Sequence, residues 1–168
     1  SGDPRLWERR AHHDDFLRVA VGRGDLRWTI PATRTPDAAA AQVIEGLSTL
    51  RDVPIEIDTS SLVGICGPRG NAVALARALL VHVAAHHGPA DVRVALFVSD
   101  RGAAEWSWAR WLPHTADETD ERTRHVACGV ATVTDLAASI RGREQGAIPL
   151  WMVIDGDDLQ LQRHTALR

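Results

Sequence analysis

The chain has 168 residues, of which 45% are hydrophobic and 24% are charged, a balance typical of a globular domain. Its formal net charge is -3 and its pI is about 6.2. Non-specific binding to nucleic acid by this chain is therefore disfavoured, because phosphate neutralisation needs a dense basic surface. No uncharged apolar run reaches the roughly 18 residues that a membrane-spanning helix needs.

Residues 1–35 are expected to form a short β-rich N-terminal segment. Residues 16–21 and 26–30 are two strand-like runs, and Gly22-Arg23-Gly24-Asp25 lies between them. A Gly-rich tetrapeptide in this position predicts a β-hairpin. The Arg-Gly-Asp triplet is an adhesion signal in some proteins, but nothing else in the sequence indicates an extracellular protein, so a hairpin turn is the preferred interpretation.

Residues 36–168 are expected to form one α/β domain that is truncated at its C-terminus, because the polar end of the chain has no stop signal. After residue 60 the strand-like and helix-like patterns alternate, which predicts a three-layer domain similar to P-loop NTPases, with a mostly parallel sheet. Hydrophobic patterns predict strands at residues 53–58, 61–66, 91–99, 126–130 and 150–154, and helices at residues 36–50, 72–87 and 134–143.

The central motif is the stretch VGICGPRGN at residues 63–71, where an apolar run enters a Gly- and Pro-rich turn before a long helix. A working phosphate-binding loop reads G-x-x-x-x-G-K-[ST]: backbone N–H groups cradle the phosphates, the lysine neutralises charge and the hydroxyl binds Mg²⁺. Alignment on Gly70 places Asn71, the expected N-cap of the helix, at the lysine position and Ala72 at the hydroxyl position. Arg69 is the only cation in the turn. The loss of both groups predicts weak anion binding at most, and no catalytic residue.

Asp155 follows the apolar run at residues 150–154, as the magnesium-side carboxylate of an ATPase follows its strand. The next position, where such ATPases often carry a catalytic acid, is Gly156. Ligands of parallel sheets bind at the carboxyl ends of strands, where this residue is expected. A simple turn at a strand end is the alternative. The candidate nucleotide-binding residues form a degenerate site, in which nucleotide binding is expected to be weak or lost. They are Gly67, Arg69, Gly70, Asn71 and Asp155.

Trp106, Trp108 and Trp111 are the candidate interface residues. Tryptophans can stack on nucleic-acid bases, but no basic companions accompany these three, so we expect apolar anchors for a neighbouring domain. His82 and His86 are four residues apart, as metal ligands can be, but no third ligand is evident and no metal site is predicted. Cys66 lies in an apolar run and is expected to be a buried, reduced thiol, which fits a cytosolic protein.

Five further segments stand out in the sequence: Leu6-Trp7-Glu8-Arg9-Arg10, Asp15-Phe16-Leu17-Arg18-Val19, Gly22-Arg23-Gly24, Gly88-Pro89-Ala90-Asp91-Val92-Arg93 and Trp108-Ala109-Arg110-Trp111-Leu112-Pro113-His114. In this order they resemble the opening of the cytoplasmic part of the FtsK/SpoIIIE-type ATPases of type VII (ESX) secretion, the EccC/EssC proteins. The Trp-Leu-Pro-His sequence that begins at Trp111 is the most specific of them. The resemblance implies a degenerate ATPase-like domain between membrane helices and later ATPase modules, which would use ATP and Mg²⁺.

The resemblance further implies a motor at the cytoplasmic face of the bacterial inner membrane, hexameric when assembled. Its partners would be other domains of the same chain, membrane-complex subunits and secreted proteins. Three functions stay open: a non-hydrolysing scaffold domain that couples the membrane region to the motor, a divergent active NTPase that uses Arg69 and Asp155, and a module of a DNA translocase. Neither a cofactor for this domain nor direct contact with nucleic acid is expected.

Overall fold

The chain divides into two compact units, one formed by residues 1–16 and 80–168 and the other by residues 17–79. The domain boundary expected between residues 35 and 36 lies outside the described residues. The computed structural model describes residues 6–29, 37–142 and 148–156.

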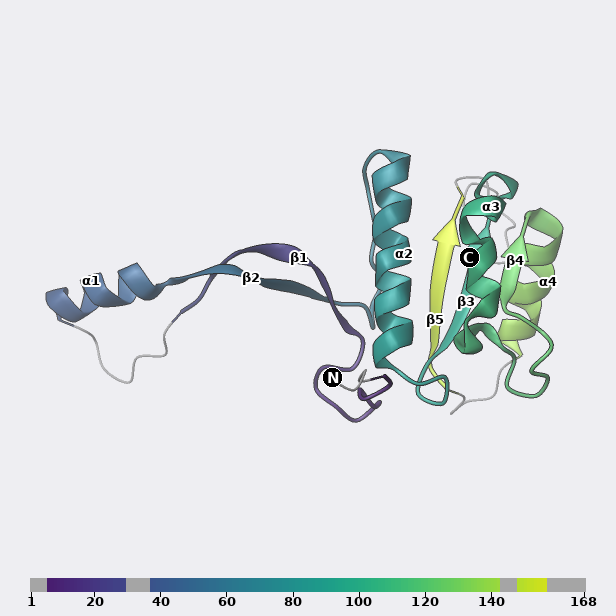
Figure 1. Cartoon of the computed structure of the whole chain (residues 1–168), viewed down its shortest axis with the longest axis horizontal. Helices are drawn as coiled ribbons and strands as arrows, with labels where there is room; N and C mark the ends of the chain where they lie inside the picture. Colours follow the sequence, from purple (N-terminus) through teal and green to yellow (C-terminus); the bar gives the residue numbers. More distant parts are fainter. Residues whose placement is uncertain (1–5, 30–36, 143–147, 157–168) are drawn as a thin grey trace, which may run out of the picture. The chain divides into compact units, whose positions relative to one another are not determined.

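The unit formed by residues 17–79 contains a long antiparallel ribbon of two strands, β1 (Arg18–Arg27) and β2 (Thr49–Asp58). The helix α1 (Ala38–Leu47) lies between them in the sequence and at one end of the ribbon (Figure 1). The side chain of Asp37 caps this helix by accepting a hydrogen bond of 2.8 Å from the backbone N–H of Ala40. The expected N-terminal β-rich segment is therefore present as an antiparallel strand pair.

The hairpin predicted within residues 16–30 is wrong, because Gly22 to Asp25 lie inside β1 rather than in a turn. The pairing with β2 shifts register between Ala20 and Gly22 and again between Gly24 and Leu26. Each shift accommodates an extra residue as a β-bulge, which is a common use of glycine within strands. The Gly-rich sequence thus bends a strand whose partner follows α1.

The segment that leads into the Gly-rich turn is also different from the prediction. Residues 61–66 form no strand, and Leu62 is 98% exposed. Cys66 is exposed rather than buried. An apolar run becomes a strand only where another strand completes its hydrogen-bond ladder, and the sequence pattern alone does not supply that partner.

The helix that follows, α2 (Arg69–His86), begins earlier than expected. The backbone N–H groups of Asn71 and Ala72 donate to the carbonyl of Pro68, at 2.9 and 3.0 Å. Asn71 therefore lies within the first turn and is not the N-cap residue that the sequence predicted.

The unit that includes residues 80–156 contains a three-stranded parallel sheet. Its central strand β3 (Arg93–Val98) lies between β4 (Val126–Cys128) and β5 (Leu150–Asp155), as Figure 1 shows. The predicted α/β class with a parallel sheet is therefore confirmed.

Both faces of β3 are covered, which is why its sequence is apolar without alternation. The helix α4 (Val130–Arg141) packs on one face. Val94, Leu96 and Val98 point to the opposite face and are fully buried. The core on the α4 side consists of Ala95, Phe97, Ala127, Val133 and Ala137.

Short helical segments connect β3 to β4: η1 (Asp100–Gly102), α3 (Ala103–Trp106), η2 (Ser107–Trp111) and η3 (Pro113–Thr115). They form the connection between the parallel strands β3 and β4. In the described part of the chain, no helix combines the length and the apolar character that crossing a membrane requires.

Candidate nucleotide-binding site

The Gly-rich turn contains a glycine in a conformation that favours this residue type. Gly67 has a φ of 151°, a conformation that side-chain-bearing residues rarely adopt. Pro68 follows and has no backbone N–H, so it removes one donor from the cradle that phosphates would need. A β-carbon at Gly70 would meet no atom within 4 Å, so this glycine is not required by close packing.

The N-terminus of α2 is the remaining feature that favours an anion. Arg69 is its first residue and is exposed, and no acidic side chain lies in the first turn. The helix dipole and a guanidinium together favour negative charge at this end. Neither the compact ammonium group nor the magnesium-binding hydroxyl of a working loop is present, because Asn71 and Ala72 stand at those positions.

Asp155 lies at the carboxyl end of β5, as the sequence predicts, and its carboxylate has a partner. Oδ2 accepts a hydrogen bond of 2.8 Å from the indole Nε1 of Trp106. The backbone carbonyl of Asp155 accepts a second bond, of 2.9 Å, from the backbone N–H of Ser99. This aspartate therefore joins β5 to the connection that follows β3.

The two halves of the expected site belong to different units, each of which is described by itself. Gly67, Arg69, Gly70 and Asn71 lie in the unit of residues 17–79, and Asp155 lies in the other. Within each unit, none of the described geometry assembles the five residues into one pocket.

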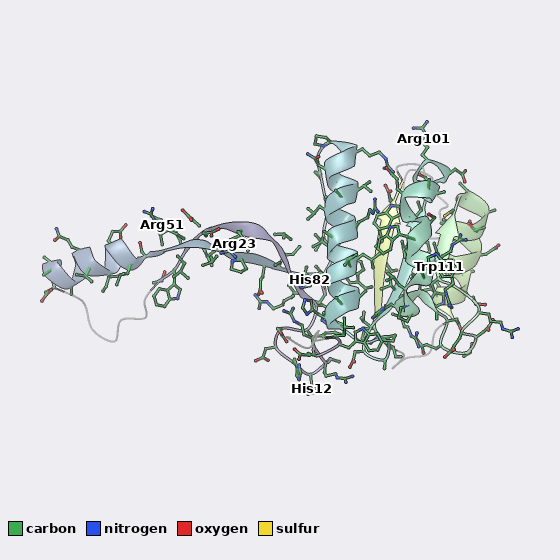
Figure 2. The ribbon with its side chains drawn as sticks, in the orientation of Figure 1. His12, Arg23, Arg51, His82, Arg101 and Trp111 are labelled. Atoms are coloured by element: carbon green, nitrogen blue, oxygen red, sulfur yellow. The ribbon has the colours of Figure 1, made fainter. Side chains whose placement is uncertain are left out.

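The three candidate interface tryptophans have different environments. Trp106 is fully buried, so it is a core residue and not an exposed anchor. Trp108 is half-buried and its indole Nε1 donates to the carbonyl of Glu105 over 3.1 Å. Trp111 is 83% exposed and is therefore the one of the three that presents a large apolar surface to solvent (Figure 2).

The histidine pair on α2 lies close together, with ring centroids 4.3 Å apart for His82 and His86. Among the described residues, no group of three or more His, Cys, Asp or Glu side chains gathers in a way that would hold a metal ion. Burial raises the pKa of the Cys128 thiol, so this cysteine is a weaker nucleophile than an exposed one.

Sequence reasoning missed two buried histidines, His87 and His114, whose exposed fractions are 0% and 1%. Nε2 of His114 lies 2.7 Å from the backbone carbonyl of His87. His114 belongs to the Trp-Leu-Pro-His sequence that carries the resemblance, and that motif was the only signal that could have singled it out.

No protein-family model matches the chain. It is 35% identical over 131 residues to the ESX secretion system protein EccC of Thermomonospora curvata, a match that covers 70% of this chain and 10% of the relative. It is 34% identical over 126 residues to the ESX-4 secretion system protein EccC4 of Mycobacterium tuberculosis, covering 67% of this chain and 10% of the relative.

A third relative extends the match over more of the chain. The ESX-5 secretion system protein EccC5 of Mycobacterium marinum is 29% identical over 163 residues, which are 88% of this chain and 11% of the relative. The chain thus spans about a tenth of the length of these relatives. On these matches, the chain belongs to the EccC family of ESX secretion system proteins and corresponds to one region of them.

Proposed function

We propose that this chain is a non-catalytic, ATPase-like coupling domain of a membrane-bound ESX (type VII) secretion ATPase. The observation that carries the proposal is the composition of the Gly-rich turn. Asn71 and Ala72 replace the lysine and the hydroxyl, and Pro68 removes a backbone donor. Phosphoryl transfer depends on positioned charge and on Mg²⁺. In working enzymes, each of the missing groups stabilises the transition state by about 3 kcal/mol.

The state of Asp155 supports the same proposal. Its Oδ2 accepts a hydrogen bond from the buried indole of Trp106, so the carboxylate has a structural role in the α/β unit. A domain with these features would transmit conformational changes between neighbouring parts of the protein. In this proposal, ATP and Mg²⁺ act in other regions, and the whole assembly is a hexamer at the cytoplasmic face of the membrane that moves secreted proteins.

The experiment is a titration of the purified chain with Mg²⁺-ATP, read by calorimetry and by phosphate release. We expect no phosphate release above that of buffer. The double variant Asn71→Lys/Ala72→Ser is the matched comparison, because it restores both missing groups. A gain in its nucleotide affinity would show that the backbone of the turn can bind nucleotide once these groups are present. Turnover by the unmodified chain that Asp155→Asn abolishes and Trp106→Phe retains would contradict the proposal and establish the divergent NTPase.

The DNA-translocase alternative has a separate test. Phosphate contacts make DNA binding weaken steeply as salt rises. With a net charge of -3, the chain is expected to show no DNA binding at physiological ionic strength, measured by fluorescence anisotropy with a labelled duplex. Salt-dependent binding in the micromolar range would favour the translocase module instead.

A further inference from the structure

The C-terminal end of α2 is capped by residues that are far away in the sequence. An α-helix leaves its last four carbonyl groups without intrahelical partners. The indole Nε1 of Trp7 donates to the carbonyl of Ala84 over 3.1 Å, and its backbone N–H donates to Ala85 over 3.0 Å. The backbone N–H of Arg9 donates to the carbonyl of His86 over 2.9 Å. The cap of this helix is therefore an N-terminal segment of the chain, residues 7–16, which we name the clasp.

Gly88 lets the clasp approach. Gly88 follows the end of α2, but its φ is not positive, so it does not form the usual left-handed glycine cap. A β-carbon at Gly88 would lie 3.6 Å from Cβ of Trp7 and 3.3 Å from Oδ2 of Asp91. Asp91 is itself paired with Arg10 of the clasp, over 2.8 Å.

Two buried histidines lie under the clasp. The ring of Trp7 contacts the ring of His114 edge to face, with centroids 6.2 Å apart, and the ring of Phe16 contacts that of His87 in the same way at 5.1 Å. The His87 ring nitrogen Nδ1 lies 2.9 Å from the carbonyl of Val83, one turn earlier in α2. Both ends of the clasp thus rest on histidine rings.

The surroundings of His114 favour its neutral form with the proton on Nε2. A carbonyl oxygen only accepts hydrogen bonds, so the 2.7 Å contact with His87 requires a proton on Nε2 of His114. The other ring nitrogen, Nδ1, is buried and has no hydrogen-bond partner among the described residues. A second proton would therefore place a charge and an unpaired N–H in the interior, which is costly.

The charges around the two rings do not offset that cost. Burial lowers the pKa of His114. The hydrogen bond to the carbonyl of His87 opposes this effect, and the guanidinium of Arg93 on β3 adds to it. Burial also lowers the pKa of His87. The hydrogen bond to the carbonyl of Val83 opposes this shift, and among the neighbouring charges Asp15 opposes it as well. The titratable and charged groups around the pair are Arg9, Arg10 and Asp15 from the clasp, His86 at the end of α2, Asp91 from the loop after it, and Arg93 from β3.

We propose that the clasp is a proton-sensitive latch, which holds the end of α2 only while His114 is neutral and opens in mild acid. This goes beyond the proposed coupling function and does not depend on it. The open state binds one more proton than the closed state, because a released His114 regains water. Its population therefore rises by up to about tenfold for each pH unit below the ordinary histidine pKa. Opening also leaves three carbonyl groups of α2 to solvent and lets the last turn fray.

The test is hydrogen exchange at the backbone amides of Trp7 and Arg9, measured from pH 7.5 to pH 5.5 and divided by the intrinsic rate at each pH. We expect protection at pH 7.5 that falls by about tenfold per unit once the pH passes below 6.5. Amides of β3 serve as the internal reference, and their protection should not change. Loss of protection in β3 together with the clasp would mean global unfolding and would overturn the latch.

His114→Gln is the decisive variant, because its amide can still donate to the carbonyl of His87 and does not titrate. We expect its clasp amides to stay protected from exchange across the whole pH range. His12→Gln is the matched control, since His12 lies exposed on the same segment (Figure 2), and its protection should follow the wild-type curve.

If His114→Gln does not fold, histidine NMR of the wild-type chain decides instead, and we expect the Nε2–H tautomer of His114 at neutral pH. The proposal would be overturned if the protection of the wild-type clasp amides did not change with pH. It would also be overturned if protection in His114→Gln still fell in acid, or if His114 were doubly protonated at pH 7.

Discussion

The indole Nε1 of Trp106 donates a hydrogen bond to Oδ2 of Asp155 over 2.8 Å, although 49 residues separate them in the sequence. Trp106 ends α3, after the central strand, and Asp155 ends the edge strand β5. In the sequence the aspartate is a candidate magnesium ligand, and in the fold it is the acceptor for a buried donor. The bond gives the carboxylate a structural role at that strand end that needs no nucleotide.

Removal of this bond should cost stability. Trp106→Phe deletes the donor and leaves most of the ring volume, so the free energy of unfolding should fall by about 1–2 kcal/mol. Trp106→Ala also leaves a cavity and should cost about 3–5 kcal/mol. Urea unfolding measures both values. Trp111→Ala is the control, because this ring is 83% exposed and its loss should change stability by less than about 0.5 kcal/mol. An equal cost at the two positions would contradict the assignment of Trp106 to the core.

Gly129 should not tolerate a side chain. Its φ is 79°, and a β-carbon there would lie 2.6 Å from Oδ1 of Asp100. Gly129→Ala should therefore lower the free energy of unfolding, measured by urea denaturation, by about 1–3 kcal/mol. Gly46→Ala is the opposite control, since no atom lies within 4 Å of its β-carbon position and it lies in α1, where alanine stabilises a helix by about 0.5–1 kcal/mol. A neutral result at residue 129 would show that the loop shifts freely.

The loop before β4 should lose stability in acid through Asp117. Its Oδ1 accepts hydrogen bonds from the hydroxyl and the backbone N–H of Thr119 and from the backbone N–H of Asp120. These bonds, those from Thr119 first, hold the pKa of Asp117 well below its usual value. A lowered carboxylate pKa adds stability above the unfolded-state pKa, and this contribution disappears as pH falls through the folded-state value.

Asp117→Asn should accordingly be less stable than the wild-type chain at pH 7, by about 1 kcal/mol for this partly exposed group. The difference should shrink below about pH 4, where the wild-type carboxylate begins to lose its advantage. Denaturant midpoints at several pH values measure it. Glu121→Gln, an exposed neighbour, is expected to show no such trend. A difference between Asp117→Asn and wild type that is constant with pH would show that the charge is irrelevant.

The ion pair on the ribbon should contribute little. Arg23 contacts both carboxylate oxygens of Asp52, at 2.9 and 3.0 Å, but the two side chains are 63% and 76% exposed. Solvent screens such pairs, so a double-mutant cycle with Arg23→Ala and Asp52→Ala should give a coupling of about 0.2–1 kcal/mol that declines in 1 M salt. A larger, salt-independent coupling would mean that the ribbon is covered in solution.

The sequence predicted the parallel sheet well, because residues buried on both faces leave a continuous apolar run such as that of β3. It failed where structure depends on distant partners. The tetrapeptide from Gly22 to Asp25 has the composition of a turn, and only the position of β2 shows that it is bulged strand. The run at residues 61–66 has the composition of a strand but has no ladder in the described structure.

For the candidate site, the sequence indicated the local positions of two residues but not their contacts. Gly67 and Asp155 lie at a special backbone position and at a strand end, as local chemistry indicates. Local chemistry does not reveal that Trp106 meets Asp155, nor that Trp7 caps a helix whose last turn lies 77 residues away. Long-range hydrogen bonds of this kind arise from the topology and leave no periodic trace in the sequence.

β5 pairs with β3 alone among the described strands, so the sheet is open along one side. On that strand Met152 is 51% exposed and Ile154 is 38% exposed. An edge strand with apolar, partly exposed side chains is a template onto which further β-structure can grow. The chain is accordingly expected to associate edge to edge in solution, and Met152→Lys should keep it monodisperse.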